Sequence, residues 1–208
     1  MIAVIDYGVG NIGSVLKAFE YLEISAKLTA DKKEIKKADG LVLPGVGAFG
    51  SGMKKLHEKD LVKVIKKEVK NGKPILGICL GLQLLFKSSE ENPSISGLCL
   101  INGEVKKIEK KEVAKIPHMG WNSLEQREEN ELLDNLEKPR DFYFIHSYYV
   151  EPADKNLIKA ETNYGNIKFA SLINKNKIWG IQPHPEKSSQ KGLQLLENFA
   201  EKIVSGGN

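Results

Sequence analysis

Short apolar segments alternate with amphipathic ones through the first half of the chain. The apolar segments predict strands at residues 2–5, 26–28, 40–43 and 73–78. Apolar side chains at helical spacing predict helices at residues 11–22, 32–37, 61–69 and 80–86. Apolar strands that alternate with helices are typical of a parallel sheet covered on both faces. We therefore expect an α/β fold with an open, mostly parallel sheet, and functional residues beyond the carboxyl ends of its strands.

The pattern changes in the second half of the chain. Strand-like segments follow one another at residues 98–116, 141–150, 157–160, 168–173 and 178–181, with a turn at Asn102-Gly103, and a last helix is predicted at residues 188–204. Successive short strands predict a mixed or antiparallel extension of the sheet. Because no linker, repeat or low-complexity tract divides the chain, we expect one domain over residues 1–208.

Composition argues against several classes of protein. The 208 residues include 31 basic and 27 acidic side chains, a net charge of +4, and the lysine pairs lie among acids and apolar residues. This is typical of solvated faces rather than of a nucleic-acid-binding stripe. The chain starts on an apolar strand without a basic leader, and no apolar stretch approaches the ~20 residues of a membrane helix. With only two cysteines, we expect a soluble protein of the reducing cytoplasm.

The segment Gly77-Ile78-Cys79-Leu80-Gly81 stands where the fourth predicted strand meets a helix. G-x-C-x-G at such a junction is the cysteine form of the nucleophile elbow, whose glycines leave room for a sharp turn that raises the central side chain above the sheet. The helix amino terminus favours the nucleophilic thiolate, and the N–H of Leu80 is placed to bind an oxyanion. We therefore predict a nucleophilic Cys79. The alternative is a buried structural cysteine, which we expect for Cys99 in its apolar strand.

A cysteine nucleophile needs a base, and the chain has four histidines. His57 lies among Lys and Glu on a helix, where we expect it to be exposed. His184 follows the last predicted strand in Gln182-Pro183-His184-Pro185-Glu186. Residues i and i+2 of an extended segment point the same way, so Glu186 is placed to orient the His184 ring. The alternative is a rigid surface turn that holds a histidine and a glutamate by chance.

These residues carry a resemblance to a known family. The elbow, with His184-Pro185-Glu186 near the carboxyl terminus, resembles the triad (class I) glutamine amidotransferases over essentially the whole chain. More closely, the chain is similar to the subfamily of glutaminase subunits of imidazole glycerol phosphate synthase, an enzyme of histidine biosynthesis. The signatures of that subfamily are found at residues 6–11, 44–47, 117–122 and 144–149. The resemblance implies a flavodoxin-like core and hydrolysis of L-glutamine to glutamate and ammonia, and we expect no cofactor and no metal.

The resemblance also implies roles for single residues. Cys79 would attack the side-chain amide carbon of glutamine to form a thioester, His184 would carry the proton, and Glu186 would orient His184. The residues implied to hold glutamine are Gly45, Gln83, Ser147 and Tyr148, with Glu91 a weaker candidate for its α-ammonium group. Gln83 lies one helical turn past Cys79 and therefore faces the same pocket.

The resemblance further implies that Leu80 and a glycine-rich loop bind the oxyanion. The N–H of Leu80 would supply one donor, and Pro44-Gly45-Val46-Gly47 would supply another through the amides of Val46 and Gly47. In the family, a peptide flip in this loop is a proposed activation switch. The alternative interpretation of the loop is an ordinary tight turn.

A partner follows from the same resemblance. Members of the subfamily form a heterodimer with a cyclase subunit, a (β/α)8 barrel whose interior passes ammonia to a second site. The implied interface residues are Asn11, His118, Met119, Trp121, Asn122, Tyr143 and Lys187. Exposed Trp and Met beside polar residues suit the core of an interface, whereas the alternative for Trp121 is packing inside its own domain. In one departure, Gly97-Leu98-Cys99-Leu100 has a cysteine where the family usually has glycine.

Gly8, Gly10 and Gly13 form a G-x-G-x-x-G followed by an acid, Asp31, as in dinucleotide-binding loops. We interpret these glycines as a tight turn with close helix packing, because dinucleotide binding leaves the elbow unexplained. Two further functions compete with the main interpretation: a glutaminase subunit for anthranilate, aminodeoxychorismate or pyridoxal phosphate synthesis, and a binding module with an inert Cys79. The segments around Trp121 and His146 argue against the former. Identification of the partner and turnover by a Cys79→Ala variant would separate these functions.

Overall fold

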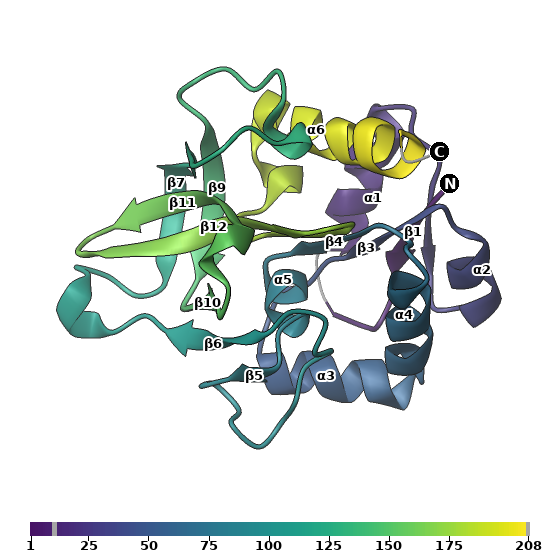
Figure 1. Ribbon diagram of the computed structural model, residues 1–208, viewed down its shortest axis with the longest axis horizontal. Coiled ribbons are helices and arrows are strands. Elements are labelled where there is room, and N and C mark those ends of the chain that lie inside the picture. Colours follow the sequence, from purple (N-terminus) through teal and green to yellow (C-terminus); the bar gives the residue numbers. More distant parts are fainter. Residues whose placement is uncertain (10–11, 207–208) are drawn as a thin grey trace.

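The computed structural model describes residues 1–9 and 12–206, and its centre is a twisted sheet with helices on both faces (Figure 1). Five of the described strands run parallel in the order β2–β1–β3–β4–β13. Their bounds are Ile2–Ile5 for β1, Ala26–Thr29 for β2, Gly40–Leu43 for β3, Ile75–Ile78 for β4 and Ile178–Ile181 for β13. The predicted α/β fold with a parallel central sheet is therefore confirmed.

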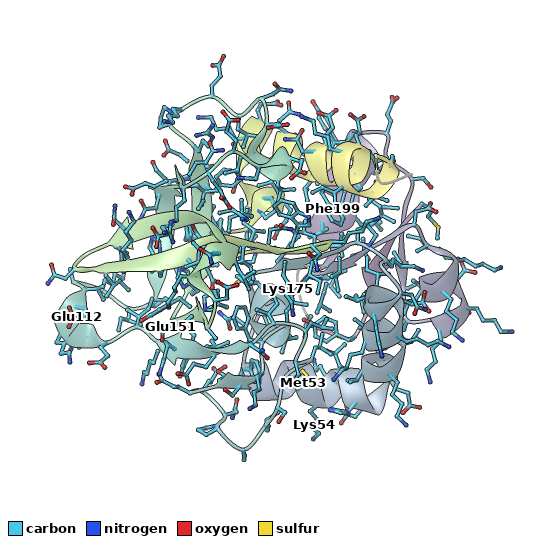
Figure 2. All side chains as sticks on the ribbon, viewed as in Figure 1. Met53, Lys54, Glu112, Glu151, Lys175 and Phe199 are labelled. Atoms are coloured by element: carbon cyan, nitrogen blue, oxygen red, sulfur yellow. The ribbon has the colours of Figure 1, made fainter. Side chains whose placement is uncertain are left out.

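Helices cover both faces of this sheet (Figure 1). One face carries α1 (Ile12–Tyr21) and α6 (Ser189–Asn198), which continues into a π-helical segment, Phe199–Ser205. The other carries α3 (Phe49–Glu58), α4 (Leu61–Lys70) and α5 (Leu80–Leu84), with α2 (Lys32–Lys37) against α4. Two apolar cores result, one on each side of the sheet, and Met53 and Phe199 mark them in Figure 2. None of the described helices is long and apolar enough to cross a membrane.

Beyond β13 the sheet becomes antiparallel, as the second half of the sequence predicts. β13 pairs with β12 (Ile167–Lys175), then come β10 (Tyr148–Pro152) and β6 (Gly103–Lys107), all antiparallel to their neighbours. The edge strand β5 (Ser88–Ser89) pairs with β6 in parallel. β11 (Ile158–Tyr164) pairs with β12 and with β8 (Glu125–Gln126). A separate antiparallel pair, β7 (His118–Ser123) and β9 (Asp141–His146), aligns His118 with His146 and Trp121 with Tyr143.

Several local predictions differ from the structure. The strand predicted at residues 141–150 is interrupted at Ser147, which separates β9 from β10. α3 is absent from the predicted helices, although His57 lies on it and is exposed as expected. Gly50 and Gly52 weaken the helical signal of α3 but let it pack closely, because a β-carbon on Gly50 would lie 2.7 Å from the Asn92 side chain.

The prediction for Cys99 is wrong. Only residues 103–107 of the predicted strand at 98–116 form a strand, β6, and Cys99 lies before it on an irregular segment. Its side chain is exposed rather than buried in the core. Its backbone φ of 54° is in the left-handed region, which favours glycine. The cysteine therefore occupies a position whose backbone geometry suits the glycine usual in the family.

Candidate active site

Cys79 occupies the sharp turn between β4 and α5, with φ 52° and ψ −108°. A positive φ is strained for a residue with a side chain, and such strain is held in place by the surrounding structure. A β-carbon on Gly81 would collide with the carbonyl oxygen of Leu43, and one on Gly77 would lie 2.8 Å from the Gly81 carbonyl oxygen. Both flanking positions therefore require glycine, and the turn has the geometry that G-x-C-x-G predicts.

Strand pairing brings the catalytic candidates together. β4 and β13 are parallel neighbours with Ile78 opposite Ile181, and the Cys79 N–H donates to the Ile181 carbonyl at 2.8 Å. The segments that follow the two strands therefore emerge side by side. His184 lies on the second of these segments, with its Nδ1 2.7 Å from Oε1 of Glu186 and both side chains at most 2% exposed.

The electrostatics of His184 depend on its two partners. Burial alone would lower the pKa of its imidazole, but hydrogen bonding with Cys79 and Glu186 and their negative charges raise it to about 10. Nε2, on the far side of the ring from Glu186, is buried and makes no well-directed hydrogen bond within the described part of the chain. This nitrogen is the one available to exchange a proton beside the thiol. The structure thus groups the three residues that the sequence selects as nucleophile, base and orienting acid.

Gln182 is a neighbour of the thiol that the sequence reasoning missed. Its Nε2 lies 3.7 Å from the Cys79 sulfur, and its side chain is fully buried. The Ile145 carbonyl lies 3.9 Å from the same sulfur. The sequence predicts an extended segment through residue 186, but Pro185–Lys187 form a short 3-10 helix that starts directly after His184. Glu186 therefore reaches the histidine from this helical turn, and strand alternation gave no signal for Gln182.

A cavity of about 290 Å³ opens in front of the thiol. Its walls are formed by Val46, Gly47, Cys79, Leu80, Gln83, Glu91, Ile145, His146, Ser147, Tyr148 and Lys187. All expected oxyanion and substrate residues are among them except Gly45. A larger hollow of about 700 Å³ lies around Met1, Pro74 and Val204, but its lining contains neither cysteine nor histidine. The smaller cavity is therefore the one that can support covalent chemistry, and its size suits a small polar ligand.

Glu91 is fixed at the edge of this cavity by the start of α3. Its Oε2 accepts a hydrogen bond of 2.6 Å from the Phe49 N–H, the first residue of that helix. The carboxylate therefore lies next to the partial positive charge of a helix amino terminus. The cavity therefore has an anionic group on one wall.

The oxyanion donor predicted at Leu80 is already engaged. Its N–H donates to the Gly45 carbonyl at 3.3 Å, so a carbonyl rather than an amide of the 44–47 loop faces it. Tyr7 lies fully buried behind this loop and donates from its hydroxyl to the Pro44 carbonyl at 2.7 Å. Burial and the charge of Cys79 raise the pKa of Tyr7, which keeps this hydroxyl protonated.

The expected interface residues separate into surface and interior positions. Met119 and Trp121 are 52% and 56% exposed, Trp121 packs edge-on against Tyr143 at 6.2 Å, and the Lys187 ammonium lies 5.9 Å above the Tyr143 ring. His118, in contrast, is 3% exposed. Its side chain lies in the interior of the isolated chain, behind the exposed residues of β7. Gly10 and Asn11 lie outside the described residues.

A cysteine on a strand-to-helix elbow, beside a buried His–Glu pair and above an open α/β sheet, is the arrangement of an enzyme that transfers acyl groups through a thioester. The chain belongs to the glutamine amidotransferase class-I family, whose model matches residues 3–203. The described residues contain no group of three His, Cys, Asp or Glu side chains that could hold a metal ion.

Curated relatives narrow the comparison within this family. The chain is 45% identical over 207 residues to imidazole glycerol phosphate synthase subunit HisH of Moorella thermoacetica, covering 100% of this chain and 97% of that protein. The HisH 1 protein of Methanococcus maripaludis is also 45% identical, over 98% of this chain and all of its own. A crystal structure of a glutamine amidotransferase has the same fold, with a TM-score of 0.72, 18% identity and coverage of 95% of this chain and 98% of that one.

Proposed function

We propose that this chain is the glutaminase subunit of imidazole glycerol phosphate synthase, which hydrolyses L-glutamine and delivers ammonia to a cyclase subunit for histidine biosynthesis. The observation that carries the proposal is the position of Cys79 next to the buried His184–Glu186 pair at the edge of a small cavity. Identity of 45% over the full length of HisH relatives supports the particular pathway. The proposed unit is a single glutamine amidotransferase domain over residues 1–208 that works in the cytoplasm.

Hydrolysis proceeds through two acyl-transfer steps. The Cys79 thiol gives its proton to His184, the sulfur attacks the side-chain amide carbon of glutamine, and the carbonyl electron pair moves onto oxygen. His184, kept protonated by its raised pKa, gives its proton to the leaving nitrogen, and collapse of the adduct releases ammonia and leaves a γ-glutamyl thioester. His184 then takes a proton from water, which attacks the thioester and releases glutamate, while Glu186 keeps the imidazole oriented.

The proposed site is switched off at rest by its own loop. While the Gly45 carbonyl accepts the hydrogen bond of the Leu80 N–H, this donor cannot stabilise an oxyanion. Rotation of the peptide between Gly45 and Val46 would remove the carbonyl and present the Val46 N–H instead, with Gly47 at φ 109° allowing the loop to change shape. One oxyanion donor is worth about 3 kcal/mol in the transition state, so this rotation suffices to control turnover.

Glutamine binding uses the other walls of the cavity. We assign the α-ammonium group to the Glu91 carboxylate and the remaining polar contacts to Gln83, Ser147, Tyr148 and the backbone at Gly45. The partner is a cyclase subunit of (β/α)8-barrel fold. It docks on the surface formed by the exposed Met119, Trp121 and Lys187 and the half-buried Asn122 and Tyr143. Asn11 is a further candidate for this interface. Docking over the cavity would pass ammonia directly to the second site.

The proposal is tested by measuring glutamate and ammonia release from glutamine, with and without the cyclase subunit and its ligand. We expect turnover by the complex and a loss of at least about 10³-fold in Cys79→Ala and His184→Ala. The control is Cys99→Ala, which removes the exposed cysteine outside the site and should retain the wild-type rate. Equal rates for wild type and Cys79→Ala would exclude the enzymatic function, and activation by another partner would exclude the assigned pathway.

A further inference from the structure

Two buried imidazoles lie at the wall of the glutamine cavity, and one of them, His146, is part of its lining. His118 of β7 and His146 of β9 are paired across the two strands, and His118 Nδ1 lies 3.0 Å from His146 Nε2. The His118 ring is stacked between Phe144 and Tyr164, with ring centroids 4.7 and 4.0 Å away. Neither histidine takes part in the proposed chemistry, and the aromatic rings fix both in place.

The hydrogen-bond partners determine where each proton lies. His146 Nδ1 is 2.9 Å from the Tyr148 carbonyl, which can only accept, so Nδ1 of His146 carries a proton. In the neutral ring, Nε2 of His146 is then an acceptor, and His118 Nδ1 must donate to it. His118 Nε2 in turn accepts from the Asn122 amide at 3.3 Å. Both rings are therefore held with the proton on Nδ1.

The environment keeps both rings neutral. Burial lowers the pKa of His146 to about 3, helped by the proximity of His118, and burial lowers the pKa of His118 to about 4. At neutral pH neither ring is charged, and the proton arrangement deduced from the geometry is the only one that satisfies all three hydrogen bonds.

The inner end of this arrangement reaches the cavity. The Tyr148 carbonyl that accepts from His146 also accepts from Gln83 Nε2 at 3.0 Å. Gln83 and Tyr148 both line the cavity. The position of the Gln83 amide therefore depends on where His146 holds the Tyr148 carbonyl.

The outer end of this hydrogen-bonded chain, the Asn122 side chain, is also held by hydrogen bonds. The Asn122 amide nitrogen also donates to the Asn163 carbonyl at 2.9 Å, and its oxygen accepts from the Ser123 N–H at 2.8 Å. These contacts settle the orientation of the amide, so its NH₂ group is the one that faces His118. Asn122 is next to the exposed Trp121 on β7.

We propose that His118 and His146 are positioning residues of the glutamine site, a neutral pair that holds the Tyr148 carbonyl and through it the Gln83 amide. The role rests on the proposed glutaminase function. Asn122, at the outer end, connects the exposed strand β7 with the glutamine cavity. Loss of the pair should therefore weaken glutamine binding and leave the chemistry of Cys79 largely intact.

The first test is steady-state kinetics of the complex with its cyclase subunit. His146→Phe keeps a ring but removes both hydrogen bonds, and should raise the KM for glutamine about tenfold with kcat within about threefold. His146→Asn retains an amide donor near the place of Nδ1 and should restore KM to within about threefold of wild type. The control is Tyr164→Phe, which keeps the ring stacked on His118 but removes the hydroxyl bonded to the Lys115 carbonyl, and should leave KM unchanged.

The second test is ¹⁵N NMR of the full chain, which distinguishes protonated from bare ring nitrogens without relying on turnover. We expect Nδ1–H and a bare Nε2 on both histidines at neutral pH. A proton on Nε2 of His146, an unchanged KM in His146→Phe, or an equal defect in His146→Asn and His146→Phe would each overturn the positioning role. A wild-type complex without glutaminase activity would instead overturn the proposed function, and the positioning role with it.

Discussion

Tyr7 confines the loop at residues 44–47, which we propose controls the oxyanion site. Its buried hydroxyl donates to the Pro44 carbonyl, immediately before the peptide that would have to rotate. A β-carbon on Gly45 would collide with the same hydroxyl and lie 3.2 Å from the β-carbon of Leu80. Position 45 therefore accepts only glycine while Tyr7 is present.

This crowding predicts coupling between positions 7 and 45. Tyr7→Phe should lower the free energy of unfolding by about 1 kcal/mol, because it leaves the Pro44 carbonyl without its donor. Gly45→Ala should destabilise by about 2 kcal/mol in the wild type and by less in the Tyr7→Phe background, where the hydroxyl no longer blocks the new methyl group. Urea unfolding of the two single variants and the double variant measures this difference. Additive effects would show that the hydroxyl and position 45 do not interact.

Cys99 is a second residue whose backbone conflicts with its side chain. At φ 54°, the backbone strain of a non-glycine residue destabilises the folded state by about 1 kcal/mol relative to glycine. Glycine offsets part of this gain, because it increases the conformational entropy of the unfolded chain. We expect Cys99→Gly to raise the free energy of unfolding by about 0.5 kcal/mol, measured as a higher urea midpoint at an unchanged slope. Cys99→Ala removes the same thiol but keeps a β-carbon, and should not be stabilising. Equal stability of the two variants would contradict the assignment of strain to this backbone.

At the scale of elements, the β7–β9 ribbon combines an exposed face with a buried one. Met119 and Trp121 are exposed on β7, while His118, Phe142, Phe144 and His146 are buried. Burial of two neutral imidazoles links the stability of this ribbon to pH, because the unfolded chain can protonate them more readily than the folded one.

The sign of this dependence follows from the two depressed pKa values. Histidine in the unfolded chain has its ordinary pKa of 6.5, whereas the pKa values of the folded residues are about 4 and about 3. The free energy of unfolding should therefore fall as the pH drops from about 6.5 toward 4, and the fall should be smaller in His146→Phe than in the wild type. Urea midpoints between about pH 4 and 7 measure this pH dependence of the free energy of unfolding. The control is His57→Gln, which replaces an exposed histidine on α3. A slope in His146→Phe equal to that of the wild type would contradict the assignment.

Local sequence is sufficient to predict some elements and insufficient for others. The strands β1, β3 and β4 are predicted to within one or two residues, because each is a short apolar run that is buried along its whole length. β7 is missed, since the sequence His-Met-Gly-Trp-Asn-Ser lacks apolar alternation and its burial is decided by pairing with β9. The interruption at Ser147 likewise results from two sheets that meet there, which no local pattern records.

At the scale of the whole molecule, the cavity continues into the exposed surface beside it. Lys187 lines the cavity and lies over Tyr143, and Tyr143 packs against the exposed Trp121. If this surface holds the cyclase subunit, Trp121 is its largest exposed apolar side chain and should contribute strongly to binding.

We expect Trp121→Ala to weaken the complex by about 2 kcal/mol, roughly 30-fold in Kd, as measured by titration calorimetry. Tyr21→Ala removes another exposed aromatic, 70% accessible at the end of α1, and should leave Kd unchanged. The same Kd for Trp121→Ala and wild type would place the partner elsewhere.

The catalytic candidates can be predicted from the sequence because each lies in a short motif that determines its local backbone geometry. Glycines on both sides of Cys79 specify the elbow. Glu186 does lie beside His184 as predicted, but it does so from the 3-10 helix Pro185–Lys187 and not from the extended segment that the spacing of two residues suggested. The hydrogen bond between the Leu80 N–H and the Gly45 carbonyl could not be predicted, because it joins two segments that are far apart in the sequence. The burial of His118 is missed for the same reason, since Tyr164 and Phe144 reach it from other strands.

Hydrogen bonding between β4 and β13, with Ile78 opposite Ile181 and the Cys79 amide bonded to the Ile181 carbonyl, sets how far apart sulfur and imidazole stand. To separate them, the molecule would have to break its central ladder, an all-or-none event that costs much of its stability. Graded control of the reaction is therefore confined to parts outside that ladder. In an enzyme of this kind, substitutions in a few loop residues could change the conditions under which it is active. The proposed nucleophile and base, Cys79 and His184, would keep their relative positions at the ends of β4 and β13.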